Sequence, residues 1–461
     1  MSGNNHTTLI LTSTIEIRLR RLSVNQTIEL IKNFLIRYAS YVNQTRANVA
    51  LDGLKAVQRR ILFVTYKIAK DKFLKTATIA GNVVAYYHPH GNASVEDAIV
   101  GMVRNGYLEG QGNWGSKCTL EEIKPAAPRY TEVKFNDKLE FAMKYINYAD
   151  FTKSEIDYDE PLLIPTPIPI GLIGNLVDYP QPQQGIGVGI RTIVPMYKFE
   201  DLVAVLEALV NNKEIPIPDP FISTYVDILQ SESKKIFTTG SGKVVVRPKF
   251  TFDGSKKQLH IYALTKNLLQ IIKPWKDKLV VKDLSTKYKT HIIIEPKKYQ
   301  KLDFEELANT ILDKMKTTIN FTTYVAIPDD KGEWIVYNIG ILPWLKAQFK
   351  YYLICRERFI QDKIKKLSDQ LAELELIKLI RPYLVKYLQN TKHPDPDDFV
   401  NQLDDSFDKE LVKQLLTKYT IKRLLSVDTD TTHVKQEIDS YKKQLETMQQ
   451  DTIQELKSIK L

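Results

Sequence analysis

Two stretches near the C-terminal end of this 461-residue chain carry apolar residues at alternating spacings of four and three. Such a seam requires a long helix that packs along a partner helix. The seams comprise Ile360, Ile364, Leu367, Leu371 and Leu374, then Val434, Ile438, Tyr441, Leu445 and Met448. Two seams separated by a shorter helical segment predict an antiparallel hairpin with a globular tip. The alternative is two ordinary amphipathic helices in a bundle. Pro382 is expected to end or kink the first helix.

The chain before this hairpin has three regions that differ in composition and in predicted secondary structure. Residues 1–150 are helical in pattern and carry a basic cluster and the histidine motifs. Residues 151–225 are rich in proline and glycine, with a short amphipathic helix expected at 198–211. Residues 226–338 alternate strand-like and helical patterns, which predicts an α+β region. Its expected elements are strands at 244–250, 258–264, 291–296 and 322–327, and a helix around 304–315.

Charge and cysteine content narrow the class of protein. Lysine and arginine number 65 against 55 aspartate and glutamate residues, a formal net charge of +10. A basic chain without a membrane-spanning apolar run indicates a polyanionic partner, most often nucleic acid. The two cysteines, Cys118 and Cys355, exclude a disulfide framework and a cysteine-rich zinc module. They indicate a reducing compartment, and we expect the cytoplasm.

The densest basic stretch runs from Lys55 to Lys75, with seven basic residues and one acid. Residues 57–70 have a helical pattern that places Arg59 and Arg60 on the polar side. Phosphate contacts from such a face position a DNA duplex without reading its sequence. A solvated basic face with no ligand is the alternative.

The next stretch predicts helix, turn and helix, at residues 76–86 and 93–103, which is the DNA-binding helix-turn-helix pattern. His88 and His90 flank Pro89 in the turn. Two histidines alone do not complete a metal site, and no further cysteine or histidine lies near in sequence. Hydrogen bonding to phosphate, or proton transfer from an attacking hydroxyl, suits them better.

A glycine-rich turn at residues 110–116 and the pair Arg129–Tyr130 follow. The glycine turn lacks the ending of a nucleotide-binding phosphate loop. A tyrosine hydroxyl becomes a useful nucleophile when a guanidinium neutralises phosphate charge nearby and a base is within reach. An isolated arginine–tyrosine pair, however, is most often structural.

Together these segments resemble the breakage–reunion subunit of type IIA DNA topoisomerases, a family that includes the A subunits of gyrase and topoisomerase IV. The motifs DGLKAVQRR, AGNVVAYYHPHG, GQGNWGS and AAPRYTE occur in the family order, followed by GIGVGIRTIVPMY. The resemblance implies a 5′-phosphotyrosine at Tyr130, transition-state stabilisation by Arg129 and His90, and a scissile-phosphate contact by Arg46. His90 is the candidate proton acceptor.

The resemblance also implies the DNA contacts and the domains. Lys55 and His88 would support the DNA beside Arg59 and Arg60, and Ile186 would wedge between base pairs. The implied fold is multidomain α+β. Its expected parts are an N-terminal arm (1–29), a winged-helix domain with the catalytic tyrosine (30–150), an α+β tower (151–338) and a coiled-coil exit gate with a dimerisation tip (339–461).

The family resemblance calls for an ATP-binding loop and a Mg²⁺ site, and their absence from this sequence predicts a partner subunit that carries them. We find no ATP-binding loop, and the acidic triplets DPD (395–397) and DTD (428–430) lie in turns far in sequence from Tyr130. A separate ATPase/Toprim-type subunit would therefore hold Mg²⁺ and hydrolyse ATP, in a heterotetramer or larger assembly. The chain itself would bind double-stranded DNA, form a homodimer through its gate and need no membrane. Relaxation and decatenation are the expected activities, and the chain most resembles a phage or viral enzyme.

Two other functions compete with this interpretation. A non-catalytic architectural DNA-binding protein could keep a winged-helix core, although binding alone requires no arginine–tyrosine pair. A tyrosine-dependent nuclease of the meiotic-recombination type would break DNA without rejoining it. Such a nuclease would not need the long C-terminal hairpin.

Overall fold

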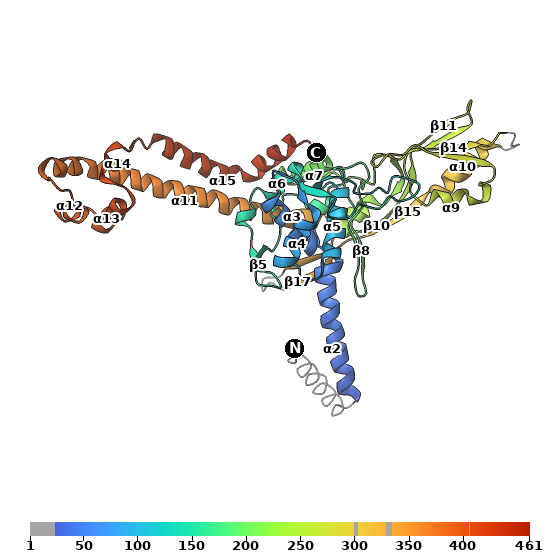
Figure 1. Ribbon diagram of the computed structural model, residues 1–461, viewed down its shortest axis with the longest axis horizontal. Helices are drawn as coiled ribbons and strands as arrows, with labels where there is room; N and C mark the ends of the chain where they lie inside the picture. The colour runs from blue at the N-terminus through green and yellow to red at the C-terminus, as the bar shows by residue number, and fades with distance from the viewer. Residues whose placement is uncertain (1–23, 299–302, 329–333, 405) are drawn as a thin grey trace. The chain divides into compact units, whose positions relative to one another are not determined.

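The computed structural model describes residues 24–298, 303–328, 334–404 and 406–461 (Figure 1). They belong to two compact units, which are the chain up to Tyr351 with Lys457–Leu461, and Tyr352–Leu456. Both helices and sheets are present, so the α+β class is confirmed. Most of the N-terminal arm expected at 1–29 lies outside the described residues. None of the described helices has the length and apolar character that a bilayer crossing requires.

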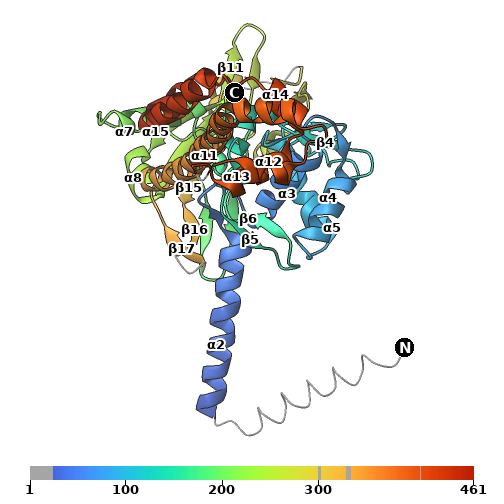
Figure 2. The same cartoon turned by 90° about the vertical axis from the view of Figure 1, so that its left-hand side faces the viewer.

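Three helices and a small sheet surround the histidine turn, which is the turn that carries His88 and His90. Figure 2 shows the helices side by side, and β4 lies between β2 and β3, antiparallel to both. Their shared core includes Ile61, Ile79, Ile99 and Phe135. The helix predicted at 76–86 is confirmed, and that at 93–103 gains one residue at each end. The elements are α3 (Ala56–Ile68), α4 (Thr76–Tyr86), α5 (Asn92–Arg104), β2 (Leu74–Lys75), β3 (Leu108–Gln111) and β4 (Glu132–Phe135).

The proline-rich segment forms two hairpins and one buried helix. β5 pairs with β6, and β7 pairs with β8, both antiparallel. The helix predicted at 198–211 is confirmed to within one residue at each end. The elements are β5 (Phe151–Lys153), β6 (Asp159–Pro161), β7 (Gln184–Ile186), β8 (Arg191–Ile193) and α7 (Phe199–Val210), and the short helix α6 (Glu140–Met143) precedes the segment.

Two larger sheets follow, in the orders β7-β8-β15-β10-β9 and β11-β12-β14-β13. α10 buries its apolar face against the second sheet, as in Figure 1, and its predicted span of 304–315 is confirmed. The elements are β9 (Val226–Ser231), α8 (Ser233–Thr239), β10 (Ser241–Pro248), β11 (Phe250–Asp253), β12 (Gln258–Ile261), α9 (Leu268–Ile272), β13 (Leu279–Asp283), β14 (Ile292–Pro296), α10 (Phe304–Met315) and β15 (Thr317–Thr322).

The strand expected as one run at 244–250 is divided between these two sheets. β10 ends at Pro248, and β11 starts at Phe250 in the other sheet. Proline has no N–H to donate to a sheet ladder, so it favours the end of a strand. The prediction of a single strand was therefore wrong at this position.

A third sheet joins distant parts of the chain. β1 (Val49–Ala50) pairs in parallel with β16 (Tyr324–Pro328), which pairs with β17 (Trp334–Asn338). Residues on both sides of the expected boundary at 150 thus belong to one sheet, whereas β17 ends at the expected boundary at 338. Both boundaries remain predictions. The boundary expected after residue 29 falls inside a continuous helix, α2 (Val24–Val42), which has no buried residue.

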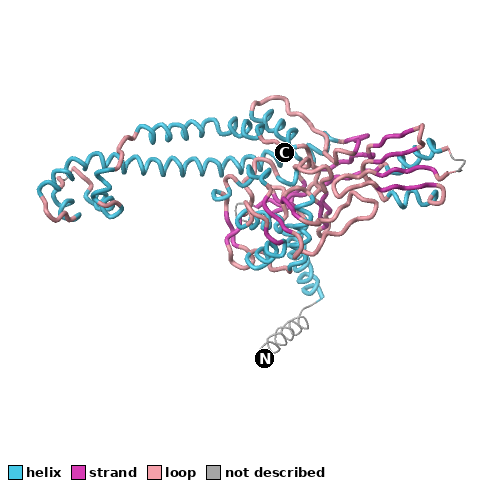
Figure 3. Tube along the Cα trace, turned by 45° about the horizontal axis from the view of Figure 1, so that its top comes forward, coloured by secondary structure: helices cyan, strands magenta, loops and turns pink. Residues whose placement is uncertain are grey.

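The second unit consists of two long helices and a helical tip (Figures 1 and 3). Arg356 donates to Thr452 Oγ1 at 2.7 Å, and Lys435 lies 2.9 Å from Glu375. These contacts require antiparallel helices. The tip has its own core of Ile377, Ile380, Phe399 and Val412 among others. The elements are α11 (Ile341–Asn390), α12 (Pro396–Gln402), α13 (Lys409–Lys418), α14 (Ile421–Ser426) and α15 (Thr432–Ser458).

Both helices predicted from the apolar seams are present. Ile360, Val434 and Ile438 are buried, and the other seam side chains are half-buried. α11 continues through Pro382 as far as Asn390, so it does not end at the proline. An interior proline costs a helix about 3 kcal/mol. The buried tip contacts on both sides of it offset that cost, because they hold α11 in place.

Candidate active site

The turn between α4 and α5 presents its two histidines to different partners. Arg60 Nη1 lies 2.7 Å from His88 Nδ1. His90 Nε2 lies 2.9 Å from one carboxylate oxygen of Glu155 and 3.1 Å from the other. The two rings meet edge to face, with centroids 4.7 Å apart. We call Arg60, His88, His90 and Glu155 the histidine cluster.

Arg60 links this cluster to the protein interior. Its Nε and Nη2 donate to Glu160 at 2.7 and 2.9 Å, and both side chains are 11% exposed. Burial opposes the charge, but hydrogen bonds and attraction from Glu160 and Glu155 outweigh it and raise the pKa of Arg60. The expected placement of Arg60 on an exposed face was wrong, because the hairpin of β5 and β6 covers that side of α3.

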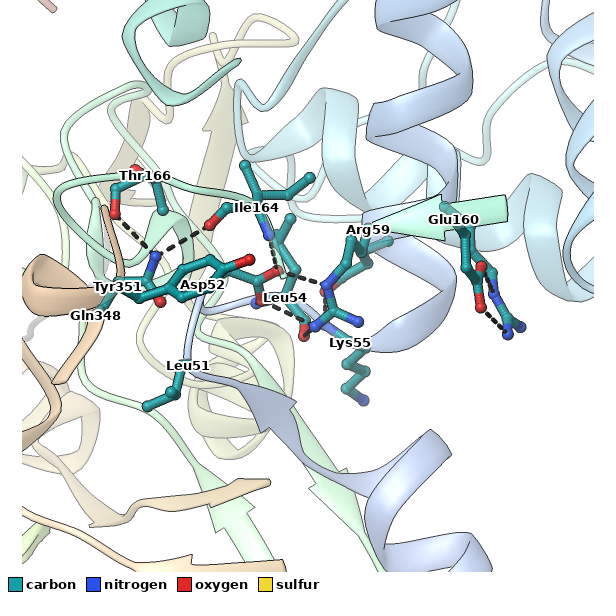
Figure 4. A network of polar contacts seen from close by, with 12 residues as sticks. Leu51, Asp52, Leu54, Lys55, Arg59, Glu160, Ile164, Thr166, Gln348 and Tyr351 are labelled. Atoms are coloured by element: carbon teal, nitrogen blue, oxygen red, sulfur yellow. Dashed lines mark hydrogen bonds and ion pairs between the residues drawn. The ribbon is translucent and has the colours of Figure 1, made fainter. Parts of the chain in front are cut away.

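Arg59 is also buried, which corrects the same prediction. Its guanidinium forms a two-point ion pair with Asp52, whose side chain is fully buried (Figure 4). Asp52 also accepts from the backbone N–H groups of Leu54 and Ile164, both at 3.0 Å. Helical periodicity identified the polar side of α3, but that side faces the Asp52 turn rather than solvent. Arg59 therefore positions the start of α3.

His88 is held in its neutral form. Burial lowers the pKa of His88 to about 4, and the positive charges of Arg60 and Arg46 contribute in the same direction, whereas Glu155 opposes them. An imidazole of this kind is uncharged at neutral pH and can donate one N–H.

Glu155 is the acidic member of the cluster. Burial raises its pKa, but hydrogen bonding and attraction from His90 and Arg60 outweigh burial, so the pKa of Glu155 is lowered. It lies in the tight turn between β5 and β6, where Asp157 adopts a left-handed backbone with φ of 66°. Because its pKa is lowered, the Glu155 carboxylate is ionised at neutral pH.

The cluster has the residue types of a metal site but a different electrostatic character. Donor atoms of His88, His90 and Glu155 lie within 4.8 Å of one another. Glu155 is a third donor that a search for cysteine and histidine overlooked. However, the Arg60 guanidinium contacts His88 and lies 3.5 Å from Glu155. Because a fixed cation already faces these donors, the site suits an anion such as phosphate better than a metal ion.

Arg46 and Tyr41 border the histidine cluster. Arg46 is exposed in the wide helical turn η1 (Asn43–Ala47), and its guanidinium carbon lies 5.3 Å from the Tyr41 ring centroid. The Tyr41 hydroxyl lies 3.3 Å from His90 Nε2. The structure thus brings Arg46, His88 and His90 together, although they are far apart in sequence.

Lys55 holds a neighbouring hairpin rather than pointing freely into solvent. Its ammonium donates to the Gln184 carbonyl at 2.7 Å, and burial lowers the pKa of Lys55. Gly185 of the same hairpin packs so closely on Ala47 that a Cβ would lie 1.9 Å from the Ala47 carbonyl oxygen. Lys55 therefore supports the β7–β8 hairpin through its hydrogen bond to the Gln184 carbonyl.

Ile186 is the most exposed apolar residue of that hairpin, with 80% of its surface accessible. Asn43 fixes the turn beside it, since it donates to the Val188 carbonyl at 3.1 Å and accepts from the Val188 N–H at 2.8 Å. A firmly held turn that presents an apolar side chain to solvent has the form of a wedge.

Tyr130 lies in a loop at residues 126–131, which we call the tyrosine loop. Its side chain is 65% exposed, and the Arg129 guanidinium carbon lies 4.6 Å from the ring centroid. The loop backbone is anchored, because Thr131 bonds Thr76 through both backbone and side chain. Gly112 of the glycine-rich turn packs against the Tyr130 carbonyl, where a Cβ would lie at 3.3 Å.

The predicted site residues therefore form two groups. Within the described part of the chain, no hydrogen bond or ion pair joins Tyr130 or Arg129 to the histidine cluster. Sequence reasoning missed Glu155, Glu160 and Asn43, which hold His90, Arg60 and the Ile186 turn. No local pattern marks them, since each acts on a residue 65 or more positions away.

Comparison with known proteins tests the resemblance noted from the motifs. Residues 48–460 match the family model of the A subunit of DNA gyrase/topoisomerase IV. The chain belongs to this family. It is 32% identical to the DNA gyrase A subunit of Thermotoga maritima over 251 residues, which are 50% of this chain and 30% of that protein.

Two topoisomerase IV relatives agree with this assignment. The DNA topoisomerase 4 A subunit of Synechocystis is 35% identical, over 45% of this chain and 24% of its own length. The Streptococcus pneumoniae counterpart is 28% identical, over 72% of this chain and 43% of its own length. The chain thus spans less than half the length of these family members.

Proposed function

We propose that this chain is the DNA cleavage–religation subunit of an ATP-dependent type II DNA topoisomerase. The observation that supports this most is the exposed Tyr130 with the Arg129 guanidinium beside its ring. The tyrosine oxygen attacks a DNA phosphorus and loses its proton to a base. The bond from phosphorus to the 3′ oxygen breaks, the 3′ oxygen leaves with the electron pair and is protonated, and a 5′-phosphotyrosine results.

The histidine cluster, together with Arg46 and Arg129, supplies the remaining chemistry at the same phosphate. Arg129, Arg46 and His88 donate to its oxygens, and His90 takes the tyrosine proton. DNA binding brings the tyrosine loop and the histidine cluster to one phosphate. When the 3′ hydroxyl attacks the phosphotyrosine, the steps reverse and the strand is rejoined. The covalent bond conserves the energy of the backbone, so rejoining needs no ATP.

The surrounding elements support a DNA-binding cleft. The packing of α3 to α5 with the β2–β4–β3 sheet supports the proposal of a winged-helix domain, in which α4, the turn of His88 and His90, and α5 are the helix-turn-helix. Ile186 wedges between base pairs and bends the duplex, and Lys55 holds its hairpin. The sheets of residues 226–328 form the tower of this proposal.

A second copy of the chain binds at the tip of the helical hairpin, as double-strand cleavage requires two tyrosines. The tip exposes Leu379, Tyr383, Val385 and Leu411, by 61%, 46%, 40% and 50% respectively. Apolar residues in this number on one small helical unit mark an interaction surface. The hairpin is thus the exit gate of a homodimer.

Mg²⁺ and ATP are assigned to a separate subunit. The acidic triplets hydrogen-bond the backbone at helix starts: Asp395 caps α12 by accepting from the N–H groups of Asp397 and Asp398, and Asp430 accepts from the N–H group of Thr432 at the start of α15. Among the described residues they do not fit an oxygen-lined Mg²⁺ site near Tyr130. An ATPase/Toprim-type partner would complete a heterotetramer, in the cytoplasm where the DNA lies.

The test combines the chain with the ATPase subunit of the same source, supercoiled DNA, Mg²⁺ and ATP. We expect a ladder of relaxed topoisomers and, after detergent, protein linked to 5′ DNA ends. Tyr130→Phe should abolish both, whereas Tyr288→Phe, at a 69% exposed tyrosine, should not. DNA bending without any covalent product would instead support the architectural DNA-binding protein.

A further inference from the structure

Glu155 belongs to none of the sequence motifs, yet its carboxylate contacts His90 Nε2. We propose that Glu155 is a positioning residue that fixes the His90 tautomer, so that the two histidines of one turn present opposite groups to the DNA. His90 offers a lone pair at Nδ1, and His88 offers an N–H at Nε2. This inference rests on the proposed cleavage function.

The His90 tautomer follows from the chemistry of its partner. Glu155 approaches His90 Nε2 with both oxygens, at 2.9 and 3.1 Å. An ionised carboxylate only accepts hydrogen bonds, so Nε2 must carry the proton. In the neutral ring Nδ1 then has the free lone pair. The Tyr41 oxygen, 3.3 Å from the same Nε2, is a second acceptor for that proton.

The opposite holds for His88. A guanidinium only donates, so the 2.7 Å contact from Arg60 requires a lone pair at His88 Nδ1. His88 Nε2 therefore carries its proton. One turn thus contains a base and a hydrogen-bond donor, distinguished only by whether a carboxylate or a guanidinium contacts the ring.

The turn that carries Glu155 is tied to the histidine turn itself. Ser154 Oγ donates to the Tyr86 carbonyl at 3.0 Å, at the last residue of α4. The same oxygen accepts from the Tyr158 N–H at 3.1 Å, which closes the β5–β6 turn. Arg60 holds the other side, 3.5 Å from Glu155. The carboxylate is thereby fixed relative to His90 from two directions.

The consequence for the reaction is a carboxylate–histidine–tyrosine triad in which only the tyrosine proton is transferred. The Tyr130 proton passes to His90 Nδ1, while the Nε2 proton stays between His90 and Glu155. The carboxylate then stabilises the imidazolium that forms, as the acid of a serine-protease triad does for its histidine. Charged groups around His90 are Glu155, Arg60 and the flanking Arg46, with neutral His88 and Tyr41.

The test uses three variants of the full chain, each assembled with its ATPase partner. Glu155→Ala removes the acceptor. Glu155→Gln keeps the shape, but its amide can either accept from or donate to Nε2 and no longer sets the tautomer. Asp159→Asn is the control, because Asp159 is an exposed acid of the same hairpin that pairs with Lys153. The measurements are single-turnover covalent-complex formation and ¹⁵N shifts of the His90 ring in the free chain, assigned with His90→Gln.

We expect wild type and Asp159→Asn to show His90 with the proton on Nε2 at pH 8. Glu155→Ala and Glu155→Gln should show mixed tautomers and form the covalent complex about 10- to 100-fold more slowly. DNA affinity should stay within about twofold. A purely structural role for Glu155 would lower stability but leave the Glu155→Gln tautomer unchanged, which would overturn the inference. Wild-type rates in both Glu155 variants would also overturn it.

Failure of the proposed function can be told apart from failure of this inference. If Tyr130→Phe still forms protein-linked DNA, the cleavage proposal fails, and the ¹⁵N shifts still decide whether Glu155 sets the His90 tautomer. If Tyr130→Phe is inactive and the Glu155 variants behave as wild type, the inference alone fails.

Discussion

The tyrosine loop and the histidine cluster differ in how the protein holds their side chains. The Tyr130 ring is 65% exposed, and its described ring contact is with Arg129. His88 and His90, in contrast, each contact a charged side chain that is itself held by other residues. The proposed nucleophile is accessible, and the groups proposed to assist it are pre-oriented. Pre-oriented charges are effective in catalysis because they need no reorganisation during the reaction.

This contrast predicts that the two regions respond differently to mutation. Changes in the histidine cluster should affect stability as well as activity. Changes to the exposed side chains of the tyrosine loop, Arg129 and Tyr130, should affect activity alone.

The largest effect is expected from Glu160→Ala. It leaves the Arg60 guanidinium buried without its main partner, and breaking a buried ion pair costs about 3–5 kcal/mol of unfolding free energy. Urea unfolding measures this cost. Asp159→Ala, one residue earlier and exposed, is the control and should lose less than about 1 kcal/mol. An equal loss in both variants would contradict the structural role of the Arg60–Glu160 pair.

Arg129→Ala should leave stability unchanged, because the side chain is exposed. Loss of one charge-stabilising donor should slow covalent-complex formation about 100- to 1,000-fold. Rapid-quench assays with the assembled enzyme measure the rate. Lys124→Ala removes another exposed cation ahead of the tyrosine loop and should have little effect. If the two variants are equally slow, general charge rather than the Arg129 position matters.

His88→Gln should change how stability depends on pH. The folded-state pKa of about 4 lies below the ordinary 6.5, so the unfolded chain binds this proton first. The stabilising contribution of neutral His88 is complete above about pH 6.5 and is lost as the pH falls towards 4. The stability deficit of His88→Gln should therefore shrink between pH 7.5 and 5 in urea unfolding. His433→Gln, at an exposed histidine, should show no such trend.

The smallest effect on the protein itself is expected from Ile186→Ala. Because 80% of Ile186 is exposed, unfolding free energy should stay within about 0.5 kcal/mol. The bend of bound DNA, measured by energy transfer between its ends, should decrease. Val188→Ala in the same turn should retain the bend. A full bend in both variants would rule out Ile186 as the wedge.

Local patterns predicted much of the secondary structure. The helices at 76–86 and 304–315 have the bounds that their apolar periodicity indicated, because each buries one face against a core. The strand at 244–250 failed where Pro248 sends the chain into a second sheet. Local pattern could not decide whether α11 ends or continues at Pro382, since the continuation depends on tip contacts from later in the chain.

The candidate site was predicted less completely than the helices. Motif order singled out Tyr130, Arg129, His88 and His90, and the structure leaves Tyr130 exposed, as its proposed role as nucleophile requires. Arg59 and Arg60 were misplaced, because periodicity identifies a polar side but not what covers it. Their partners Asp52 and Glu160 show that this side is an interior of paired charges.

The amino-acid sequence by itself determined which segments become helices and which side chains carry reactive groups, since both depend on neighbours within a few positions. Tertiary structure decided which charge faces which ring. Glu155 reaches His90 across 65 positions, and Glu160 reaches Arg60 across 100. Hydrogen bonding depends on distance in space, so a carboxylate beside one histidine and a guanidinium beside the other exist only after the chain has folded.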